Sequence, residues 1–159
     1  MLIGGSPCQG FSFAGKQLAF DDPRSKLFFV YVDILNHIKS VNPNIKFMLE
    51  NVKMKKEFLA VISEKLGVEP VFINSALVSA QNRQRYYWCN WFVAPVDPKK
   101  VYLADILETP GHGYIKNKGT WVSKPLNSQC LDANYHKGVD NHGQRTMIKS
   151  NGVYRKLTP

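Results

Sequence analysis

Residues 1–12 read MLIGGSPCQGFS, and the rest of the chain is interpreted outward from this stretch. The apolar run Met1–Ile3 is typical of the end of a buried strand, and Gly4-Gly5 predicts a tight turn directly after it. Glycine permits close backbone approach, and Pro7 fixes one torsion beside Cys8. The pattern predicts a thiol at the mouth of a sheet, so Cys8 is a candidate nucleophile, although a lone cysteine is more often a small buried hydrophobe.

Composition narrows the class of protein. A chain of 159 residues with 44% hydrophobic and 21% charged residues is long enough for one globular domain and is not typical of a disordered or membrane protein. No run is long enough to span a bilayer and no signal pattern is visible, which predicts a cytoplasmic location. Lys and Arg outnumber Asp and Glu by 21 to 12. That excess favours a polyanionic partner such as nucleic acid.

The cysteines indicate a reducing compartment. Cys8, Cys89 and Cys130 are far apart and form no CxxC pair, which argues against both a disulfide framework and a zinc site. We expect Cys89 and Cys130 to be packing residues.

A strand–helix–strand unit follows from the next two patterns. Apolar residues at helical spacing predict a helix from Ser25 to just before Asn42, with one buried face: Leu27, Tyr31, Ile34, Leu35 and Ile38. The run NIKFMLENV, residues 44–52, is typical of a parallel strand buried on both faces. Because ligands collect at the carboxyl ends of parallel strands, Cys8 and Glu50 are predicted to lie at one edge of the sheet.

Further elements are predicted up to Pro95. Lys53–Leu66 reads as an amphipathic helix that stops at Gly67, and Pro70–Val78 reads as a strand. Gln81, Arg83 and Arg85 alternate toward one side at the start of an aromatic strand, Trp88–Val93, in which Trp88 and Trp91 are expected to be core residues. Two guanidinium groups on one face suit base edges and phosphates, although a solvated edge explains the same alternation.

Beyond Pro95 the signal for regular structure is weak. Leu103–Leu107 predicts a short helical turn, and Pro110–Lys118 reads as a loop rich in Gly, Lys and His. Residues 124–149 are polar, and no secondary structure is predicted for them.

Three motifs in order carry a resemblance to a known family: Pro7-Cys8-Gln9, Glu50-Asn51-Val52 and the run Gln81–Arg85, QNRQR. Together they resemble the bacterial and phage DNA (cytosine-5)-methyltransferases of the restriction–modification type. The closing run Arg155–Pro159, RKLTP, is similar to the opening of a late family motif. Complete members also carry a Phe-x-Gly-x-Gly cofactor loop and acidic strands, which this sequence lacks, so the resemblance implies a fragment of a longer enzyme.

The resemblance implies an α/β fold: a partial Rossmann-like methyltransferase sheet with flanking helices, followed by a small irregular basic region. Residues 1–95 would be the catalytic half and residues 96–159 a rudimentary target-recognition region. The implied cofactor is S-adenosylmethionine, with Pro7 and Leu27 lining its pocket. The implied substrate is double-stranded DNA, and a second chain or missing segment would carry the cofactor-binding half.

The resemblance also implies residue roles in methylation of cytosine carbon 5. Cys8 would attack carbon 6 of a flipped cytosine, Glu50 would hold or donate a proton at ring nitrogen 3, and Arg85 would contact the carbonyl oxygen of the base. Arg83, which the resemblance also implies as a catalytic residue, would support the closed loop or the DNA backbone together with Gln81. The remaining implied DNA contacts are Gln9, Ser12 and Gln81.

Two other interpretations stay open. One is a split or remnant methyltransferase half that binds DNA without cofactor. The other is an unrelated thiol enzyme that pairs Cys8 with a histidine, and the candidates are His37, His112, His136 and His142.

Overall fold

The computed structural model describes residues 1–7, 26–107, 111–124, 126–129, 131 and 135–157. The chain divides into two compact units, the first made of Met1–Ile73 and Gln84–Ala94, the second of Asn74–Arg83 and Pro95–Pro159. Among the described helices, none combines the length and the apolar character needed to cross a membrane.

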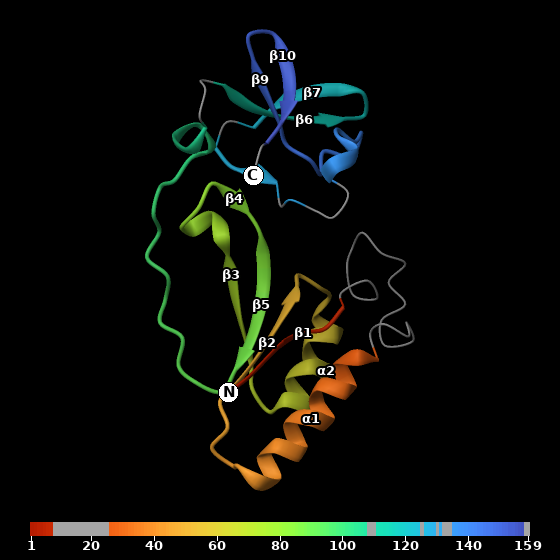
Figure 1. The fold of residues 1–159 in the computed structure, drawn as a ribbon, viewed down its shortest axis with the longest axis vertical. Helices are drawn as coiled ribbons and strands as arrows, with labels where there is room; N and C mark the ends of the chain where they lie inside the picture. Colours follow the sequence, from red (N-terminus) through yellow and green to blue (C-terminus); the bar gives the residue numbers. More distant parts are fainter. Residues whose placement is uncertain (8–25, 108–110, 125, 130, 132–134, 158–159) are drawn as a thin grey trace. The chain divides into compact units, whose positions relative to one another are not determined.

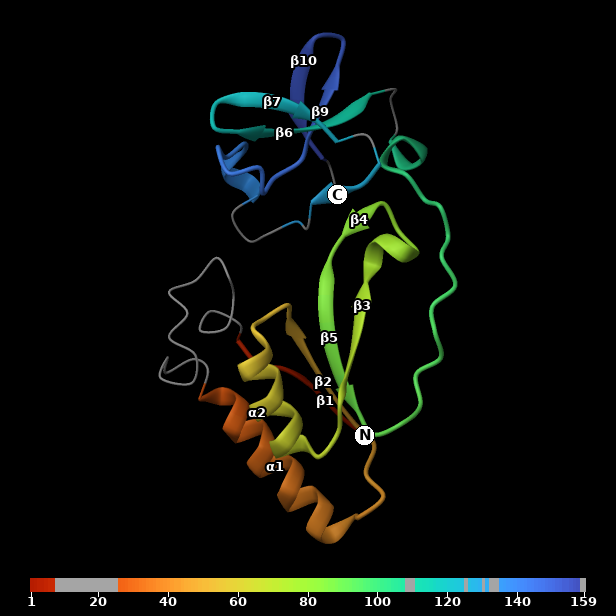
Figure 2. The same ribbon diagram turned by 180° about the vertical axis from the view of Figure 1, so that it is seen from behind.

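The first unit is built on a four-stranded sheet of order β1-β2-β5-β3. Its strands are β1 (Leu2–Gly5), β2 (Phe47–Val52), β5 (Gln84–Cys89) and β3 (Pro70–Asn74). β1 pairs with β2 in parallel, as predicted, and β2 pairs with β5 antiparallel. Figures 1 and 2 show β5 lying between β2 and β3. The sheet is therefore mixed, with parallel and antiparallel pairs, and the unit is of the α/β class.

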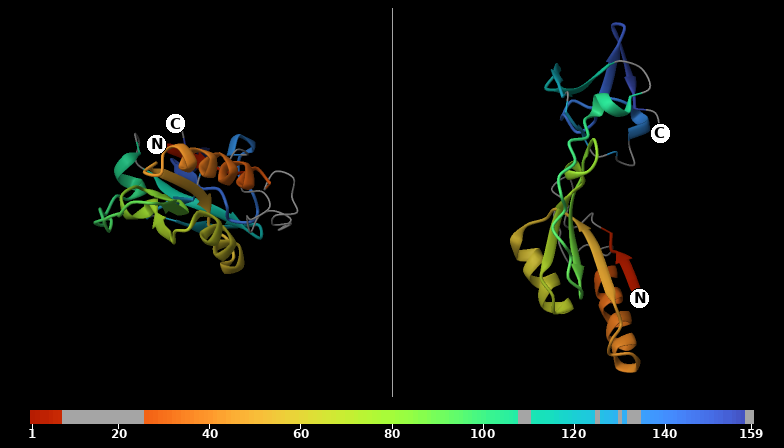
Figure 3. Two further views of the ribbon diagram at one scale, coloured as in Figure 1. Left: turned by 90° about the horizontal axis from the view of Figure 1, so that it is seen from below. Right: turned by 90° about the vertical axis from the view of Figure 1, so that its left-hand side faces the viewer.

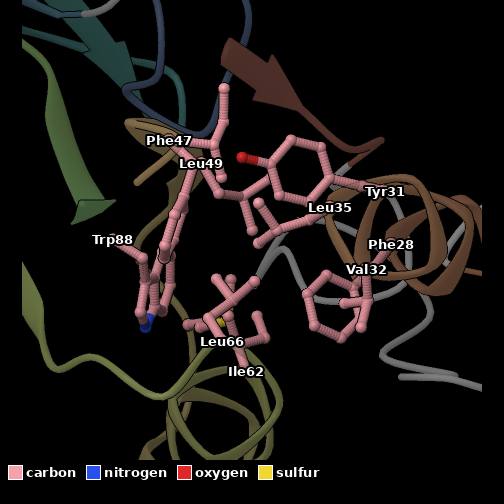
Figure 4. Close-up of a cluster of buried hydrophobic side chains, with 11 residues drawn as sticks. Phe28, Tyr31, Val32, Leu35, Phe47, Leu49, Ile62, Leu66 and Trp88 are labelled. Atoms are coloured by element: carbon pink, nitrogen blue, oxygen red, sulfur yellow. The ribbon is translucent and has the colours of Figure 1, made fainter. Parts of the chain in front are cut away.

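Two helices, α1 (Leu27–Val41) and α2 (Lys56–Leu66), share one core with the sheet. In Figure 4, Phe28 and Val32 of α1 point toward Ile62 and Leu66 of α2, and Trp88 of β5 closes the cluster. The indole Nε1 of Trp88 donates a hydrogen bond to Ser63 Oγ at 3.0 Å. The buried polar atom of Trp88 is therefore satisfied, which a fully buried tryptophan requires.

Both helices were predicted, but the prediction of which residues of the first helix are buried is partly wrong. Leu27 and Ile34 are 51% and 46% exposed, whereas Phe28 and Val32 are buried. The segment LFFVYVDIL is apolar on nearly all sides, so periodicity alone does not fix which side faces the sheet. The second helix begins at Lys56 rather than Lys53 and ends at Gly67, whose φ of 71° is the left-handed conformation of a helix cap.

The prediction of a buried strand followed by a tight turn at Gly4-Gly5 is wrong. Both glycines belong to β1, opposite Leu49 and Glu50 of β2. β1 is the edge of the described sheet, and Ile3 is 56% exposed. Gly4 is needed because a Cβ there would lie 2.6 Å from the Tyr31 ring, whose hydroxyl donates to Met48 O at 3.0 Å. Burial raises the pKa of Tyr31 to about 12, so this donor stays protonated even at alkaline pH, where an exposed tyrosine begins to ionise.

Two strand boundaries also differ from prediction. β3 ends at Asn74, and a 3-10 turn over Ser75–Leu77 replaces the rest of the predicted strand, because the Asn74 side chain accepts a hydrogen bond from Ala76 N. β5 covers Gln84–Cys89 instead of starting at Trp88. Trp88 and Cys89 are buried, as expected, but Trp91 is only half-buried. Cys130 lies outside the described residues.

The second unit contains more regular structure than the sequence predicts. The predicted turn near Leu103 is present as a 3-10 helix over Leu103–Ile106. The segment interpreted as a loop at Pro110–Lys118 is mostly strand β6 (His112–Asn117). Figure 3 gives two further views of the strands that follow it. These are β7 (Thr120–Ser123), β8 (Ser128–Gln129), β9 (Met147–Ser150) and β10 (Val153–Lys156).

Two sheets organise this unit. β4 (Gln81–Asn82) pairs in parallel with β8, and the other strands form a sheet of order β10-β9-β6-β7. Ile148 is fully buried there with Leu103 and Ala80. The long-range pairing of short strands explains why local periodicity missed them.

Replacing Gly4 with alanine should destabilise the first unit by about 1–3 kcal/mol, the usual penalty for overpacking. The new Cβ would meet the Tyr31 ring, which cannot move away without breaking its bond to Met48 O. Urea unfolding of the Gly4→Ala and wild-type chains measures the loss. Gly5→Ala is the control, because its Cβ would make only an ordinary contact at 3.4 Å with Glu50 Oε2. Equal unfolding midpoints for the two variants would show that the Gly4 contact is unimportant.

Candidate active site

The candidate site begins where β1 and β2 end. In the parallel register Gly5 lies opposite Glu50, and a Cβ on Gly5 would be 3.4 Å from Glu50 Oε2. The parallel pairing confirms that the segment leading to Cys8 and the Glu50 carboxyl lie at one edge of the sheet. Cys8 itself lies outside the described residues, as do Gln9 and Ser12, and the roles expected of them stay predictions.

Glu50 forms an ion pair with Arg85 of β5. Arg85 Nε lies 2.7 Å from Glu50 Oε1, and the side chains are 16% and 31% exposed. Since Val52 is opposite Arg85 and Glu50 is opposite Tyr87, the two charged residues are diagonal neighbours on one face of the sheet. Arg85 Nη1 also donates to Gln84 O at 2.9 Å. The pairing thus orients a carboxylate and a guanidinium side by side at the carboxyl end of β2.

Such a pair has a definite chemical capacity. A carboxyl can accept or hold a proton on a heterocyclic nitrogen, and a guanidinium presents several N–H donors in a rigid fork to a carbonyl oxygen. The sequence suggested Glu50 and Arg85 separately, but not their contact. Only the antiparallel register between β2 and β5 brings them together.

Asn51 is a positioning residue to which the sequence analysis assigned no role. Its side chain is 1% exposed, and its Nδ2 donates to Ser6 Oγ at 3.0 Å and to Ser6 O at 3.4 Å. Its Oδ1 accepts from Val52 N at 2.8 Å. One buried amide therefore fixes both the end of β2 and the residue two positions before Cys8. A polar residue directly after Glu50 in an otherwise buried strand was the available signal.

Gln81 and Arg83 do not continue β5 as predicted. Gln81 is in β4, and Arg83 lies between β4 and β5, so the alternation toward one side is interrupted there. Ser75 holds the backbone on both sides: its N donates to Arg83 O at 3.0 Å and its Oγ donates to Gln81 O at 2.7 Å. Both residues belong to the second unit, whereas Arg85 belongs to the first. Their expected contacts with DNA stay predictions.

Pro7 and Leu27 are the residues expected to line a cofactor pocket. Pro7 follows β1 and is half-buried, and Leu27 begins α1 with 51% of its surface exposed. Both therefore present some apolar surface, and the cofactor contact expected of them stays a prediction. Neither carries a donor or acceptor side chain for a ribose or an amino acid group. In the described part of the chain, no three His, Cys, Asp or Glu residues come together as a metal site.

Truncating Asn51 should destabilise the first unit by about 1–3 kcal/mol, the range for leaving buried partners unsatisfied. Asn51→Ala removes the bonds to both Ser6 and Val52. Urea unfolding is the measurement, with Ser6→Ala as the matched variant, because it removes only the bond to Ser6 Oγ. We expect Ser6→Ala to lose less than half as much stability. If the two variants lose the same amount, the amide has no wider positioning role.

Comparison with known proteins identifies the family to which the chain is similar. The family model "C-5 cytosine-specific DNA methylase" matches residues 1–90, more than half of the chain. The type II methyltransferase M.HpaII of Haemophilus parainfluenzae is 31% identical over an alignment of 182 residues. This alignment covers 100% of this chain and 46% of the relative. M.BanI of Aneurinibacillus aneurinilyticus is 39% identical, over 71% of this chain and 28% of the relative.

A third relative gives the same result. M1.ScrFI of Lactococcus lactis subsp. cremoris is 42% identical, over 55% of this chain and 24% of the relative. The chain thus spans between about a quarter and just under half of the length of these relatives. Motifs, sheet register and sequence similarity agree, and the chain belongs to the C-5 cytosine-specific DNA methylase family.

Proposed function

We propose that this chain is the catalytic half of a DNA (cytosine-5)-methyltransferase, which methylates carbon 5 of cytosine in double-stranded DNA. The observation that carries the proposal is the Glu50–Arg85 ion pair beside Gly5, three residues before the Cys8 thiol. A carboxyl and a guanidinium match the ring nitrogen and the carbonyl oxygen of cytosine. The family membership supports this chemistry over an unrelated thiol enzyme.

The reaction begins with nucleophilic attack. The Cys8 thiolate adds to carbon 6 of cytosine, and the ring electrons move so that carbon 5 becomes nucleophilic. Glu50 holds the proton at nitrogen 3, and Arg85 donates N–H groups to the carbonyl oxygen, which together offset the charge that the ring gains. When carbon 5 has taken a methyl group, a base to which no residue is assigned removes its proton. The electrons of that C–H bond re-form the double bond between carbons 5 and 6, and the Cys8 sulfur leaves carbon 6 as a thiolate.

The substrate base must leave the duplex. Carbons 5 and 6 are inaccessible in stacked DNA, so the cytosine is flipped out at a cost of a few kcal/mol. Contacts from Gln9, Ser12, Gln81 and Arg83 to the DNA would offset this cost. The net charge of +9 favours the same polyanionic partner.

S-adenosylmethionine is the proposed cofactor, and it supplies the methyl group when bound. Pro7, two residues after β1, and Leu27, at the start of α1, would offer apolar contacts for it. Polar contacts to its ribose and amino acid groups would come from a second segment. We infer a Rossmann-like sheet completed by that segment, with residues 1–95 as the catalytic half and residues 96–159 as the target-recognition region.

The first unit has a surface suited to that second segment. β1 is an edge strand of the described sheet, with Ile3 56% exposed. Along α1, Leu27, Val30 and Ile34 are 46–51% exposed and fall on one stripe, because residues three, four and seven apart share a helix face. The stripe flanks Tyr31, which contacts β1 at Gly4, whereas Phe28 and Val32 face α2 (Figure 4). An open strand edge and an apolar stripe on the same side would accept a further parallel strand with its helix.

Exchange of the carbon-5 hydrogen tests the catalytic assignment without a methyl donor. DNA tritiated at cytosine carbon 5 should release tritium into water with the wild-type chain, because attack by Cys8 alone makes carbon 5 accept a proton. Cys8→Ala should abolish the release. Glu50→Gln should slow it by about 10²-fold or more while leaving DNA affinity nearly unchanged, because its role is proton transfer.

The control variant is Glu64→Gln, an exposed carboxylate on α2. It should release tritium at the wild-type rate. Release by Cys8→Ala at that rate would disprove the nucleophile. A wild-type chain that binds DNA but never releases tritium would favour the non-catalytic DNA-binding alternative.

Complementation with a second chain tests whether the apolar stripe on α1 contacts the second segment. The part of M.HpaII outside the matched region, supplied as a separate chain with S-adenosylmethionine, should restore methyl transfer. Ile34→Lys should weaken the restored activity by about tenfold or more, because a charge would be buried at the contact. Val153→Lys, at an apolar residue that is 66% exposed in the second unit, is the matched control. Equal effects of the two lysine variants would rule out the α1 stripe as the contact.

A further inference from the structure

The two faces of the β10-β9-β6-β7 sheet differ in the side chains that they carry. Ile115 and Ile148 are 8% and 0% exposed and point to one face, whereas aromatic rings and lysines lie on the other. Side chains alternate along each strand, so the residues adjacent to these isoleucines point the opposite way. We call this opposite side the aromatic–lysine face and define it by five residues: Tyr114, Lys116, Trp121, Lys149 and Tyr154.

The strand register confirms that these residues share one side. Lys116 lies directly opposite Trp121, and Tyr154 lies directly opposite Lys149. β10 and β7 are at opposite ends of the sheet order. Nevertheless, the rings of Tyr154 and Trp121 stack, with their centroids 3.7 Å apart and an angle of 5° between their planes. The sheet must therefore curl, and Figures 1 and 2 show the β9–β10 hairpin crossing β6 and β7. Tyr114 meets Tyr154 edge-on at 5.6 Å, which completes a continuous aromatic surface.

Two ammonium groups are held over this surface. Lys149 Nζ lies 5.3 Å from the Tyr154 ring centroid and 6.0 Å from that of Tyr114, and Lys116 Nζ lies 6.0 Å from that of Trp121. These are the separations of cation–π contacts. Such contacts orient an ammonium without neutralising it, so its three N–H donors stay able to bind an anion.

No carboxylate balances these charges within the sheet. The four strands HGYIKN, TWVS, MIKS and VYRK contain no Asp or Glu, but they contain four Lys and Arg residues. The described carboxylate nearest in sequence, Asp140, accepts from His142 N and Gln144 N and pairs with Arg145 instead. An aromatic cluster that only stabilised the sheet would explain the ring contacts. It would not explain two lysines that form no ion pair with any carboxylate in the described part of the chain.

We propose that the aromatic–lysine face binds the DNA substrate, with Lys116 and Lys149 on backbone phosphates and the exposed parts of the rings against sugars or bases. The proposal rests on the proposed function and adds a contact surface to it. Positive charge interleaved with aromatic rings is the combination that holds nucleic acid without reading its sequence. This surface therefore contributes affinity and orientation, not sequence specificity.

Salt-dependent DNA binding of the full chain tests the two lysines. Fluorescence anisotropy with a labelled duplex gives the slope of log affinity against log salt concentration. Lys116→Gln with Lys149→Gln should make that slope shallower by about 2 and weaken binding by about tenfold at moderate salt, as expected for two lost phosphate contacts. Lys99→Gln with Lys100→Gln removes the same charge at two exposed residues outside the sheet, and should leave the slope nearly unchanged. Equal shifts for the two double variants would overturn the proposal.

The aromatic contribution is tested at Trp121. Trp121→Phe keeps a ring and should bind DNA nearly as the wild type does, whereas Trp121→Leu should bind several-fold more weakly. Circular dichroism and urea unfolding check that each variant is folded, and the lysine pair decides the matter if Trp121→Leu is not. Cys8→Ala should bind DNA normally while losing tritium release. Unchanged DNA binding in the lysine pair, with tritium release still dependent on Cys8, would reject this face and leave the catalytic proposal intact.

Discussion

The register between β1 and β2 is the constraint on which the candidate site depends. It places Gly5 opposite Glu50, and it is fixed by the contact of Gly4 with the Tyr31 ring and by the bond from the Tyr31 hydroxyl to Met48 O. A shift of β2 by one residue against both of its neighbours, β1 and β5, would turn Glu50 to the other face of the sheet. There it would meet the apolar core of α1 and α2 instead of Arg85. Fold and site are therefore set by the same few contacts.

The strand–helix–strand core could be predicted because its signals are local. The sequence shows an apolar run that leads to Glu50 and an apolar helix before it. It also shows Asn42-Pro43, which ends that helix. The facing of α1 could not be predicted, because Leu27 and Phe28 are both apolar and only the packing decides between them. The prediction of a turn at Gly4-Gly5 failed for a related reason. Gly4 serves close packing against Tyr31 within a strand, and a glycine pair is equally typical of a turn.

The parts that escaped prediction depend on pairing between distant segments. The contact of Glu50 with Arg85 needs β5 to insert between β2 and β3, and nothing in the run QNRQR shows that the strand breaks at Arg83. In the second unit, Tyr114, Lys116 and Trp121 alternate on short polar strands, a pattern that resembles a loop when no partner strand is known. The Asn51 amide was within reach of inference, because a buried polar residue after a candidate acid needs partners.

The candidate active site and the aromatic–lysine face handle positive charge in opposite ways. Arg85 is matched by a carboxylate at 2.7 Å, which fixes its direction and limits it to a role beside Glu50. Lys116 and Lys149 lie over aromatic rings, which fix their position but leave their charge uncompensated within the sheet. Chemistry on one base requires a paired, directional cation, whereas binding along a phosphate backbone requires a cation that is oriented and still charged. The same difference separates the residues whose substitution should change the chemical step from those whose substitution should change only the affinity for DNA.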